Sequence, residues 1–516
     1  MFIKVLMLVL FFGLMVGVGV YCHSHATDVN GFVLGGRSVG PWLTAFAYGT
    51  SYFSAVIFVG YAGQFGWKYG LASTWIGLGN AFIGSLLAWA VLGRRTRIMT
   101  QQLDSRTMPE FFGRRFNSKG VKIGASAIIF IFLIPYTASL YNGLSRLFAM
   151  AFNIDYTVCI VIMAILTGIY VIAGGYMATA INDFIQGIIM LVGMVAVILA
   201  VLSQNGGFLS SVEKLAQVED EAVSSMPGAF ASFFGPDPLN LLCVVILTSL
   251  GTWGLPQMVQ KFYAIKTEGA ISKGTVISTA FAVVVAGGCY FLGGFGRLYA
   301  DKIDIAANGY DSVVPTMLET LSPFLLGVIV ILVLSASMST LSSLVLASSS
   351  TLTLDFLKDN IVKKMDEKKQ VLTMRVLIVV FILISAVLAI IQYRRNVTFI
   401  AQLMGVSWGA LAGAFLAPFL YGLYMKRTSL ASVWVSFIFG AGIMTLNLFF
   451  RSAFPPFLQS PINCGAFAMV AGLIIVPVVS FLTPRPNQRI IDFAFSGYNR
   501  TVTVTQREAL GKSEEI

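Results

Sequence analysis

The chain alternates between long apolar segments and short polar connections along almost its whole length. A helix needs about 20 apolar residues to cross a bilayer, and the hydropathy pattern predicts about thirteen such segments. They leave no room for a large globular domain, because the longest polar stretches are residues 205–236 and the tail after Pro484. The pattern therefore predicts an all-helical polytopic membrane protein.

Composition supports this prediction. Of the 516 residues, 57% are hydrophobic and 11% are charged, with a mean hydropathy of +0.83, whereas soluble domains carry about 25% charged residues. The net charge of +11 is concentrated in residues 94–122, 261–273, 358–375 and 426–427 and in the C-terminal tail. With thirteen spans these segments share one side, so we expect them to be cytoplasmic and the N-terminus to lie outside. This distribution indicates membrane topology and no nucleic-acid partner.

Two of the expected spans are interrupted in a similar way. The second contains GTSYFS at residues 49–54, and the seventh contains TSLGTWGLP at residues 248–256. Glycine and proline weaken helices, and hydroxyl side chains can satisfy the backbone groups that a break frees. Kinking at a packing contact would explain one such segment. Two of them, five spans apart, predict two inverted five-helix repeats that meet at a binding site near the membrane midplane.

The two repeats divide the chain into six parts. Residues 3–21 carry one charge, Lys4, near their start, and no small-residue cleavage site comes after them, so we interpret them as a retained helix. The expected parts are an N-terminal extra helix with a cytoplasmic loop (1–37), the first repeat (38–204), an extracellular loop (205–235), the second repeat (236–425), two C-terminal helices (426–484) and a cytoplasmic tail (485–516).

A hydroxyl-rich helix face lies inside the apolar segment that runs from about residue 323 to 354. Its members are Ser339, Ser342 and Ser343, which share one face, with Thr340 beside them. Such residues can allow close helix packing, but oxygen ligands also suit a hard cation such as sodium. The break in the second span favours the cation, because the free carbonyls of Thr50 and Phe53 would complete an oxygen cage with Ser339 and Thr340.

The main carboxylate at membrane depth is Asp183, near the start of the sixth span. It either caps that helix or binds an ion, and the sequence favours neither alternative. No phosphate-binding Gly-x-x-x-x-Gly-Lys-Ser/Thr motif is present, and the chain has only two histidines. ATP-driven transport and histidine-based catalysis therefore have no support, and we do not expect an enzyme.

Several motifs together resemble the sodium/solute symporter family, which includes sodium/proline, pantothenate and sialic acid symporters and sodium/glucose cotransporters. The motifs are LGGRSVGP at residues 34–41, TMPEFF at 107–112, GGY at 174–176, NDFIQ at 182–186 and MSTLSS at 338–343. The similarity runs from about residue 35 to about residue 426. It implies the leucine-transporter-type fold of inverted five-helix repeats, with one helix before the core and two after it.

The resemblance also implies ligands for Na⁺, the only expected cofactor. A first sodium would be held by the carbonyls of Thr50, Phe53 and Ala336 and the hydroxyls of Ser339 and Thr340. A second sodium, which some family members bind, would use Asp183, Ser339, Ser342 and Ser343.

The substrate region departs from the sodium/proline symporters that the chain otherwise resembles most. Tyr52 stands where those carriers have an aspartate, Val56 where they have an aromatic residue, and Thr248 and Thr252 where they have tryptophan and tyrosine. The expected pocket residues are Tyr52, Thr248, Thr252, Trp253 and Gln402.

These features predict a sodium-coupled secondary active symporter in the cell membrane. We expect it to import a small organic solute, an amino acid or another carboxylate-bearing compound, by alternating access. Pantothenate, a sugar or sialic acid are alternative substrates, and a solute sensor or an uncoupled channel of the same fold is an alternative function. The expected partners are the solute, sodium and the lipid bilayer, and no sequence feature sets the oligomeric state or the sodium stoichiometry.

Overall fold

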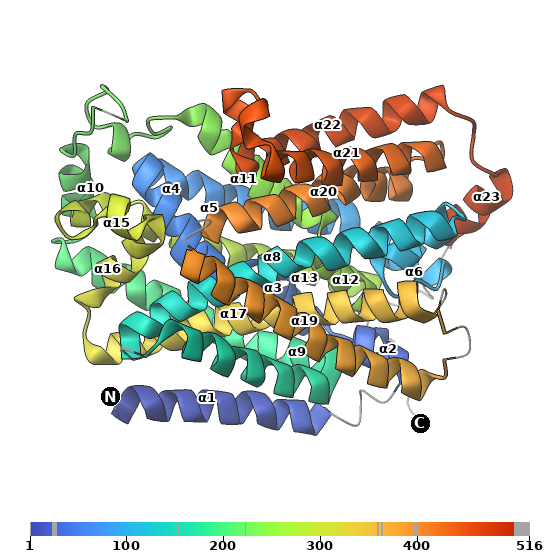
Figure 1. The fold of residues 1–516 in the computed structure, drawn as a ribbon, viewed down its shortest axis with the longest axis horizontal. Helices are drawn as coiled ribbons and strands as arrows, with labels where there is room; N and C mark the ends of the chain where they lie inside the picture. Colours follow the sequence, from blue (N-terminus) through green and yellow to red (C-terminus); the bar gives the residue numbers. More distant parts are fainter. Residues whose placement is uncertain are drawn as a thin grey trace, which may run out of the picture.

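Figure 1 shows a computed structural model of the chain, in which long helices lie side by side in a single bundle. The structure describes residues 2–22, 28–152, 154–221, 223–358, 361–362, 365–395 and 400–499. All regular elements in these ranges are helical, and β-pairing is limited to two isolated bridges. The prediction of an all-helical protein is confirmed.

The elements are as follows. The long helices are α1 (Phe2–Tyr21), α8 (Lys119–Phe152), α9 (Tyr156–Gln204), α11 (Pro238–Gly254), α13 (Glu268–Ala282), α17 (Pro323–Thr351), α19 (Glu367–Arg395), α20 (Ile400–Tyr424), α21 (Leu430–Phe449) and α22 (Pro461–Leu482). The shorter helices are α2 (Val29–Leu34), α3 (Pro41–Tyr52), α4 (Ala62–Tyr69), α5 (Thr74–Gly79), α6 (Arg94–Gln102), α7 (Met108–Arg115), α10 (Phe208–Ala216), α12 (Pro256–Ala264), α14 (Gly288–Gly293), α15 (Ile305–Asn308), α16 (Val313–Glu319) and α23 (Gln488–Ser496). Wider π-helical turns join several of them, namely η3 (Val56–Tyr61), η5 (Asn80–Leu87), η6 (Trp89–Gly93), η8 (Val283–Gly287) and η11 (Leu352–Leu357).

The helices account for the thirteen predicted spans. In the described ranges nine helices are long and apolar enough to cross a membrane, and the bent pair α11–α12 makes ten. Two shorter apolar helices, Val5–Tyr21 and Tyr156–Ile169, add two more crossings. The segment Val56–Gln102 has 47 residues, about twice what one crossing needs. It turns at Gly70, where φ is +59°, and so supplies the last one.

Both predicted interruptions are present as breaks in the helices. α3 ends at Tyr52, and Phe53 is extended, with φ −84° and ψ 127°. α11 ends at Gly254, Leu255 is extended with φ −82° and ψ 123°, and α12 leaves at 45°. A third break lies within α9 at Gly175, whose φ of +55° favours glycine. The break separates the fifth span from the sixth.

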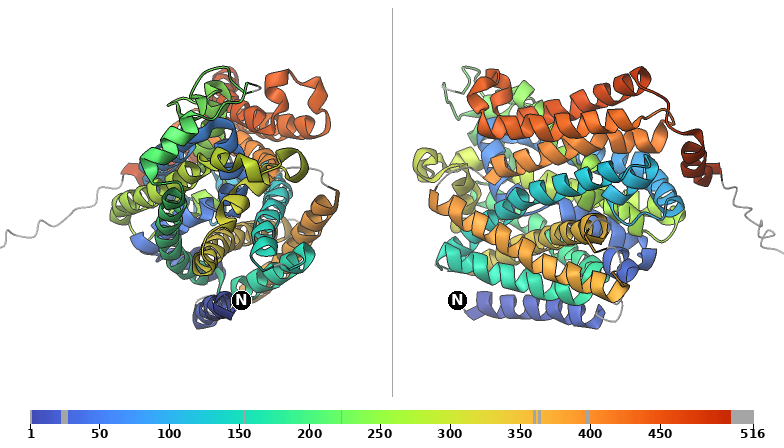
Figure 2. Two further views of the ribbon diagram at one scale, coloured as in Figure 1. Left: turned by 90° about the vertical axis from the view of Figure 1, so that its left-hand side faces the viewer. Right: turned by 45° about the vertical axis from the view of Figure 1, so that its right-hand side comes forward.

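The broken helices lie at the centre of the bundle. Figure 1 and the end-on view in Figure 2 show α1 at one edge and α21 and α22 at another, with α3 and α12 between them. The apolar stretch is 94% buried in α20 and 78% buried in α17, against 39% in α19, α21 and α22. The helices α17 and α20 are therefore the scaffold against which the breaks are held.

The basic segments gather at one end of the bundle, as the prediction of topology requires. Figure 1 shows α2, α6 and α23 at that end, with α4, α10, α15 and α16 at the opposite end beside the N-terminus. Contacts between the segments agree: Arg94 pairs with Glu268 at 2.7 Å, and Arg115 donates to the carbonyl of Gly422 at 2.9 Å. We call this the basic end. The tail of the chain beyond residue 499 lies outside the described residues.

Candidate functional site

Five oxygen atoms converge where α17 passes the break after α3. The hydroxyl of Ser339 lies 3.0 Å from the carbonyl oxygens of both Thr50 and Ala336. The hydroxyl of Thr340 lies 3.2 Å from the carbonyls of Thr50 and Phe53, and 3.1 Å from that of Ala336. All five residues are fully buried. The structure thus brings together every residue expected at the first sodium site, and we call this group the oxygen cage.

The oxygen cage has fewer hydroxyl protons than it has oxygen–oxygen contacts at hydrogen-bond distance. Each hydroxyl carries one proton, so Ser339 and Thr340 supply two protons to the five oxygen–oxygen contacts between 3.0 and 3.2 Å. The remaining contacts place lone pairs against one another. A hard cation in the middle would turn all of these lone pairs into ligands. Because no carboxylate belongs to the cage, its chemistry suits a monovalent ion.

The residues expected at a second sodium site are arranged around a lysine. The ammonium of Lys261, on α12, lies 3.7 Å from a carboxylate oxygen of Asp183 and donates to the hydroxyl of Ser343 at 3.0 Å. Ser342 donates to its own helix, at the carbonyl of Ser339. Of the four expected ligands, Asp183 and Ser343 therefore meet at one point, and Lys261 is already there.

Asp183 does not cap a helix. It lies within α9 with helical residues on both sides, because the sixth span begins at the kink at Gly175 rather than near Asn182. The side chain is 1% exposed. A carboxylate this deeply buried needs a positive partner. The capping alternative is therefore wrong, and the carboxylate is left for a cation.

An aromatic cluster lies beside the oxygen cage. The ring of Trp408, on α20, is 5.8 Å from that of Tyr52 and 5.9 Å from that of Tyr136. The members of this cluster that have a buried polar atom without a hydrogen-bond partner are Tyr52, Ser54, Tyr136, Tyr290 and Trp408. Buried polar atoms are normally bonded. The Tyr52 hydroxyl faces that of Tyr290, and the Tyr136 hydroxyl faces Ser54 and the indole of Trp408. Four hydroxyls and one indole nitrogen that face one another in this way indicate a ligand site, which we call the donor cluster.

The other expected pocket residues have partners elsewhere. Thr252 donates to the carbonyl of Gly84 and the indole of Trp253 to that of Ile83, each at 3.0 Å. Both acceptors belong to η5, whose π-helical turns leave carbonyls that neighbouring helices can satisfy. Thr248 donates to its own helix, and Gln402 accepts from the exposed Arg451. Of the five expected residues, only Tyr52 belongs to the donor cluster.

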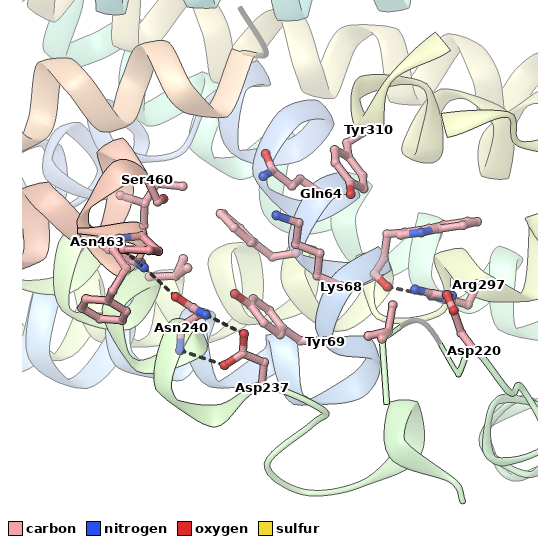
Figure 3. Close-up of a pocket in the computed structure, with 17 residues that line it drawn as sticks. Gln64, Lys68, Tyr69, Asp220, Asp237, Asn240, Arg297, Tyr310, Ser460 and Asn463 are labelled. Carbon is pink, nitrogen blue, oxygen red and sulfur yellow. Dashed lines mark hydrogen bonds and ion pairs between the residues drawn. The ribbon is translucent and has the colours of Figure 1, made fainter. Parts of the chain in front are cut away.

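A polar cavity of about 750 Å³ lies at the end of the bundle opposite the basic end (Figure 3). It is bordered by α4 and by the start of α11, the ends of the two broken spans that lie away from the basic end. Its polar lining includes Gln64, Lys68, Tyr69, Asp237, Asn240, Arg297 and Asn463. Arg297 is paired with Asp220 at 2.6 Å, and the ammonium of Lys68 lies 5.3 Å from the ring centre of Tyr310.

Sequence reasoning missed Lys261, Trp408 and Tyr290. Lys261 is part of a basic run and was expected to mark topology, but it is 2% exposed. Its only signal was that it lies five residues after Pro256, within the broken span. Trp408 and Tyr290 lie in apolar segments, where an aromatic residue is most often a packing residue.

Known proteins with similar sequences are transporters. The sequence profile of the sodium:solute symporter family matches residues 32–440. The osmoregulated proline transporter OpuE of Bacillus subtilis (strain 168) is 28% identical over 481 residues, which cover 92% of this chain and 94% of that protein. The sodium/proline symporter of Staphylococcus aureus (strain JH9) is 27% identical over 522 residues, covering 98% of this chain and 96% of that protein.

A solved structure supports the fold independently. A Na⁺-coupled sialic acid symporter in a substrate-bound outward-open state superimposes with a TM-score of 0.73 at 17% identity, covering 95% of this chain and 99% of that chain. At this identity the likeness shows the fold, which is the expected leucine-transporter type. The extent of the profile match, across the whole ten-helix core, shows that the chain belongs to the sodium:solute symporter family.

Proposed function

We propose that this protein is a sodium-coupled symporter in which the oxygen cage binds sodium and the donor cluster binds a small solute that bears a carboxylate, such as an amino acid. The observation that carries the proposal is the shortage of protons in the cage: two hydroxyl protons for five oxygen–oxygen contacts. A cation resolves that shortage, and a buried neutral cage favours a monovalent one.

Adjacent residues couple the two sites. Phe53 gives a carbonyl to the cage, and its neighbours Tyr52 and Ser54 belong to the donor cluster. All three lie at the break after α3, so a change of backbone there changes both sites. Sodium binding would hold the break against α17 and favour the state in which the solute donors are assembled, a shift of population through differential affinity.

The chemistry of the donor cluster supports the solute class. Its polar atoms are four hydroxyls and one indole N–H, and hydroxyls and N–H groups donate well to a carboxylate. No charged side chain belongs to the cluster, so a net cationic solute would lack a partner. The relatives named proline transporters agree with an amino acid, although Tyr52 alters the pocket at a point where we expect them to carry an aspartate.

The cavity at the end opposite the basic end supports a route of entry. It borders the outer ends of both broken spans and is lined by polar groups. We assign that end to the outside, with the N-terminus, and the basic end to the cytoplasm, because basic loops are retained inside. Sodium and solute would then enter through this cavity and leave at the basic end.

Uptake into proteoliposomes tests the proposal. The purified protein is reconstituted, and uptake of labelled proline is measured with an inward sodium gradient and with sodium replaced by choline. Other neutral amino acids, pantothenate, sialic acid and glucose serve as competitors, in case proline is not the preferred solute. We expect uptake that requires sodium and competition led by a carboxylate-bearing solute. Equal flux in choline would indicate a channel, and sodium-independent solute binding without any flux would indicate a sensor; either result would reject the proposal.

A further inference from the structure

The ammonium of Lys261 has three neighbours at the centre of the bundle and is linked to a fourth residue through one of them. It donates to Ser343 on α17 at 3.0 Å and lies 3.7 Å from the Asp183 carboxylate on α9. The ring centre of Tyr176, also on α9, is 5.1 Å away, within the range of a cation–π contact. The linked residue is Ser51, whose hydroxyl contacts that of Ser343.

These hydrogen bonds run in one direction. Lys261 donates to Ser343, whose hydroxyl lies 2.8 Å from that of Ser51, and Ser51 in turn donates to the carbonyl of Ala47. Because Ser51 uses its proton on Ala47, Ser343 must donate to Ser51. The oxygen of Ser343 therefore accepts from the ammonium, with its proton used on Ser51. The chain of bonds joins α12 and α17 to α3.

The charges at this point balance. The side chains of Lys261 and Asp183 are 3% and 1% exposed, so neither charge is solvated by bulk water. Apart from the ammonium, neither oxygen of Asp183 has a hydrogen-bond partner among the described residues. A buried carboxylate without a cation is strongly unfavourable. Lys261 supplies the positive charge that a bound metal ion would otherwise supply.

The other two expected ligands of a second sodium are engaged in other hydrogen bonds. Ser342 donates to the Ser339 carbonyl, and Ser339 belongs to the oxygen cage through Thr50 and Ala336. A second cation would have to enter beside an ammonium that already holds Asp183 and Ser343. Two cations sharing one carboxylate repel each other strongly in a buried site.

We propose that the Lys261 ammonium permanently fills the second cation site, so that this symporter binds one sodium, in the oxygen cage, in each transport cycle. The inference rests on the proposed function, since it assumes that the cage binds sodium. It makes Lys261 a residue that sets the coupling ratio. With one sodium per solute, the accumulation of a neutral solute follows the first power of the sodium gradient.

Counting bound sodium on the purified full-length protein tests this inference. Binding of ²²Na⁺ is measured at saturation, and we expect one ion per chain for the wild type. Lys261→Met removes the charge but keeps an unbranched side chain, so Asp183 and Ser343 become free to take a second ion. We expect two ions per chain, together with a rise of the Hill coefficient for sodium from one toward two.

Two further variants separate this effect from a general disturbance. Lys273→Met makes the same substitution at an exposed lysine of α13 and should leave one ion. The charge-neutral double variant Lys261→Met/Asp183→Asn removes the carboxylate as well and should also return to one ion. If Lys261→Met is not obtained as folded protein, Asp183→Asn alone tests where the ion binds. It should still bind one sodium ion per chain, because that ion is in the oxygen cage.

The outcomes distinguish this inference from the proposed function. Two ions on the wild type, one of them lost in Asp183→Asn, would overturn the role of Lys261 while leaving sodium coupling intact. An unchanged single ion in folded Lys261→Met would do the same. No sodium on the wild type at any concentration would reject the proposed function and this inference with it. One ion on the wild type that Thr340→Ala loses and Asp183→Asn keeps, with two on Lys261→Met, would support both.

Discussion

The hydroxyl of Thr340 lies 3.2 Å from the carbonyl oxygen of Phe53, the residue at which α3 gives way to extended backbone. This contact joins α17, whose apolar stretch is 78% buried, to a broken helix. It also places a side chain that mutation can remove beside a backbone oxygen that mutation cannot remove. Thr340 is therefore the most direct probe of the oxygen cage.

Replacing Thr340 with alanine should raise the sodium concentration for half-maximal uptake severalfold or more, because a hard cation loses an oxygen ligand. The measurement is sodium-dependent solute uptake in proteoliposomes. Thr340→Ser keeps the hydroxyl and should retain most of the sodium affinity. Folded Thr340→Ala with unaltered sodium dependence would mean that the cation binds elsewhere.

A second prediction concerns Gly251, on α11, which lies against the indole of Trp408. A Cβ atom at this position would be 2.8 Å from Trp408 Cε3, closer than carbon atoms approach one another. Gly251→Ala should therefore displace the indole from the donor cluster and weaken solute binding by roughly tenfold, corresponding to about 1–2 kcal/mol for a lost buried hydrogen bond. Sodium binding without solute should remain close to that of the wild type.

The matched control for this change is Gly442→Ala on α21, where an added Cβ atom would meet nothing within 4 Å. It makes the same substitution in another apolar helix without a steric contact. Solute affinity should be unchanged in Gly442→Ala. Equal effects of the two substitutions on solute affinity would show that Trp408 is not part of the solute site.

The fold and the oxygen cage could be predicted because each depends on local patterns. The apolar segments define the spans, glycine and proline mark the breaks near residues 53 and 255, and the spacing of Ser339, Ser342 and Ser343 puts them on one helix face with Thr340 beside them. Such features follow from the chain within a few residues of themselves. The resemblance to the sodium/solute symporter family then indicated that the break and these hydroxyls form one site.

The solute pocket and the role of Lys261 depend on contacts between distant segments. Thr252 and Trp253 have the residue types of a pocket, but η5 offers them carbonyls, and no sequence pattern marks those turns as π-helical. Lys261 lies 78 residues from Asp183 in a basic run, and only the packing of α12 against α9 and α17 turns it inward. Trp408 likewise meets Tyr52 only through the packing of α20 against the break.

Tyr52 and Tyr61 offer a matched pair of substitutions. Both are buried, but the Tyr52 hydroxyl has no hydrogen-bond partner, whereas the Tyr61 hydroxyl donates to the carbonyl of Ala401 at 3.2 Å. Tyr52→Phe should weaken solute binding by about 1–2 kcal/mol with little loss of stability, because the lost hydroxyl faces only another hydroxyl, that of Tyr290, when no solute is bound. Tyr61→Phe should instead lower stability by about 0.5–1.5 kcal/mol.

Solute affinity and thermal unfolding of the two purified variants, measured in the absence of solute, check this prediction. A hydroxyl that serves only packing would affect stability and solute affinity together. Loss of stability in Tyr52→Phe with solute affinity unchanged would remove Tyr52 from the proposed site. The comparison needs no assumption about which carboxylate-bearing solute is carried.

Arg37 is expected to hold the basic end closed. Its guanidinium donates to the carbonyls of Ser105 at 2.6 Å, Tyr263 at 3.2 Å and Thr100 at 3.4 Å. It thereby joins the chain before α3 to the loop after α6 and to the end of α12. Burial, with Arg97 nearby, lowers the pKa of Arg37 to about 10, so the group is still charged at neutral pH.

Arg37→Ala should lower stability by about 1–3 kcal/mol, because buried carbonyls lose charged donors, and should expose the basic end of α12 to labelling. Arg37→Lys keeps the charge but has no planar fork to reach several carbonyls, so an intermediate result is expected. The control is Arg94→Ala, since Arg94 and Glu268 form a pair whose side chains are 65% and 46% exposed, worth about 0–1 kcal/mol. The measurements are thermal unfolding and the labelling rate of a cysteine introduced at Ala264, the buried last residue of α12. Equal labelling rates in Arg37→Ala and Arg94→Ala would contradict a latch at Arg37, because only the buried donor bridges the segments that must separate for release at this end.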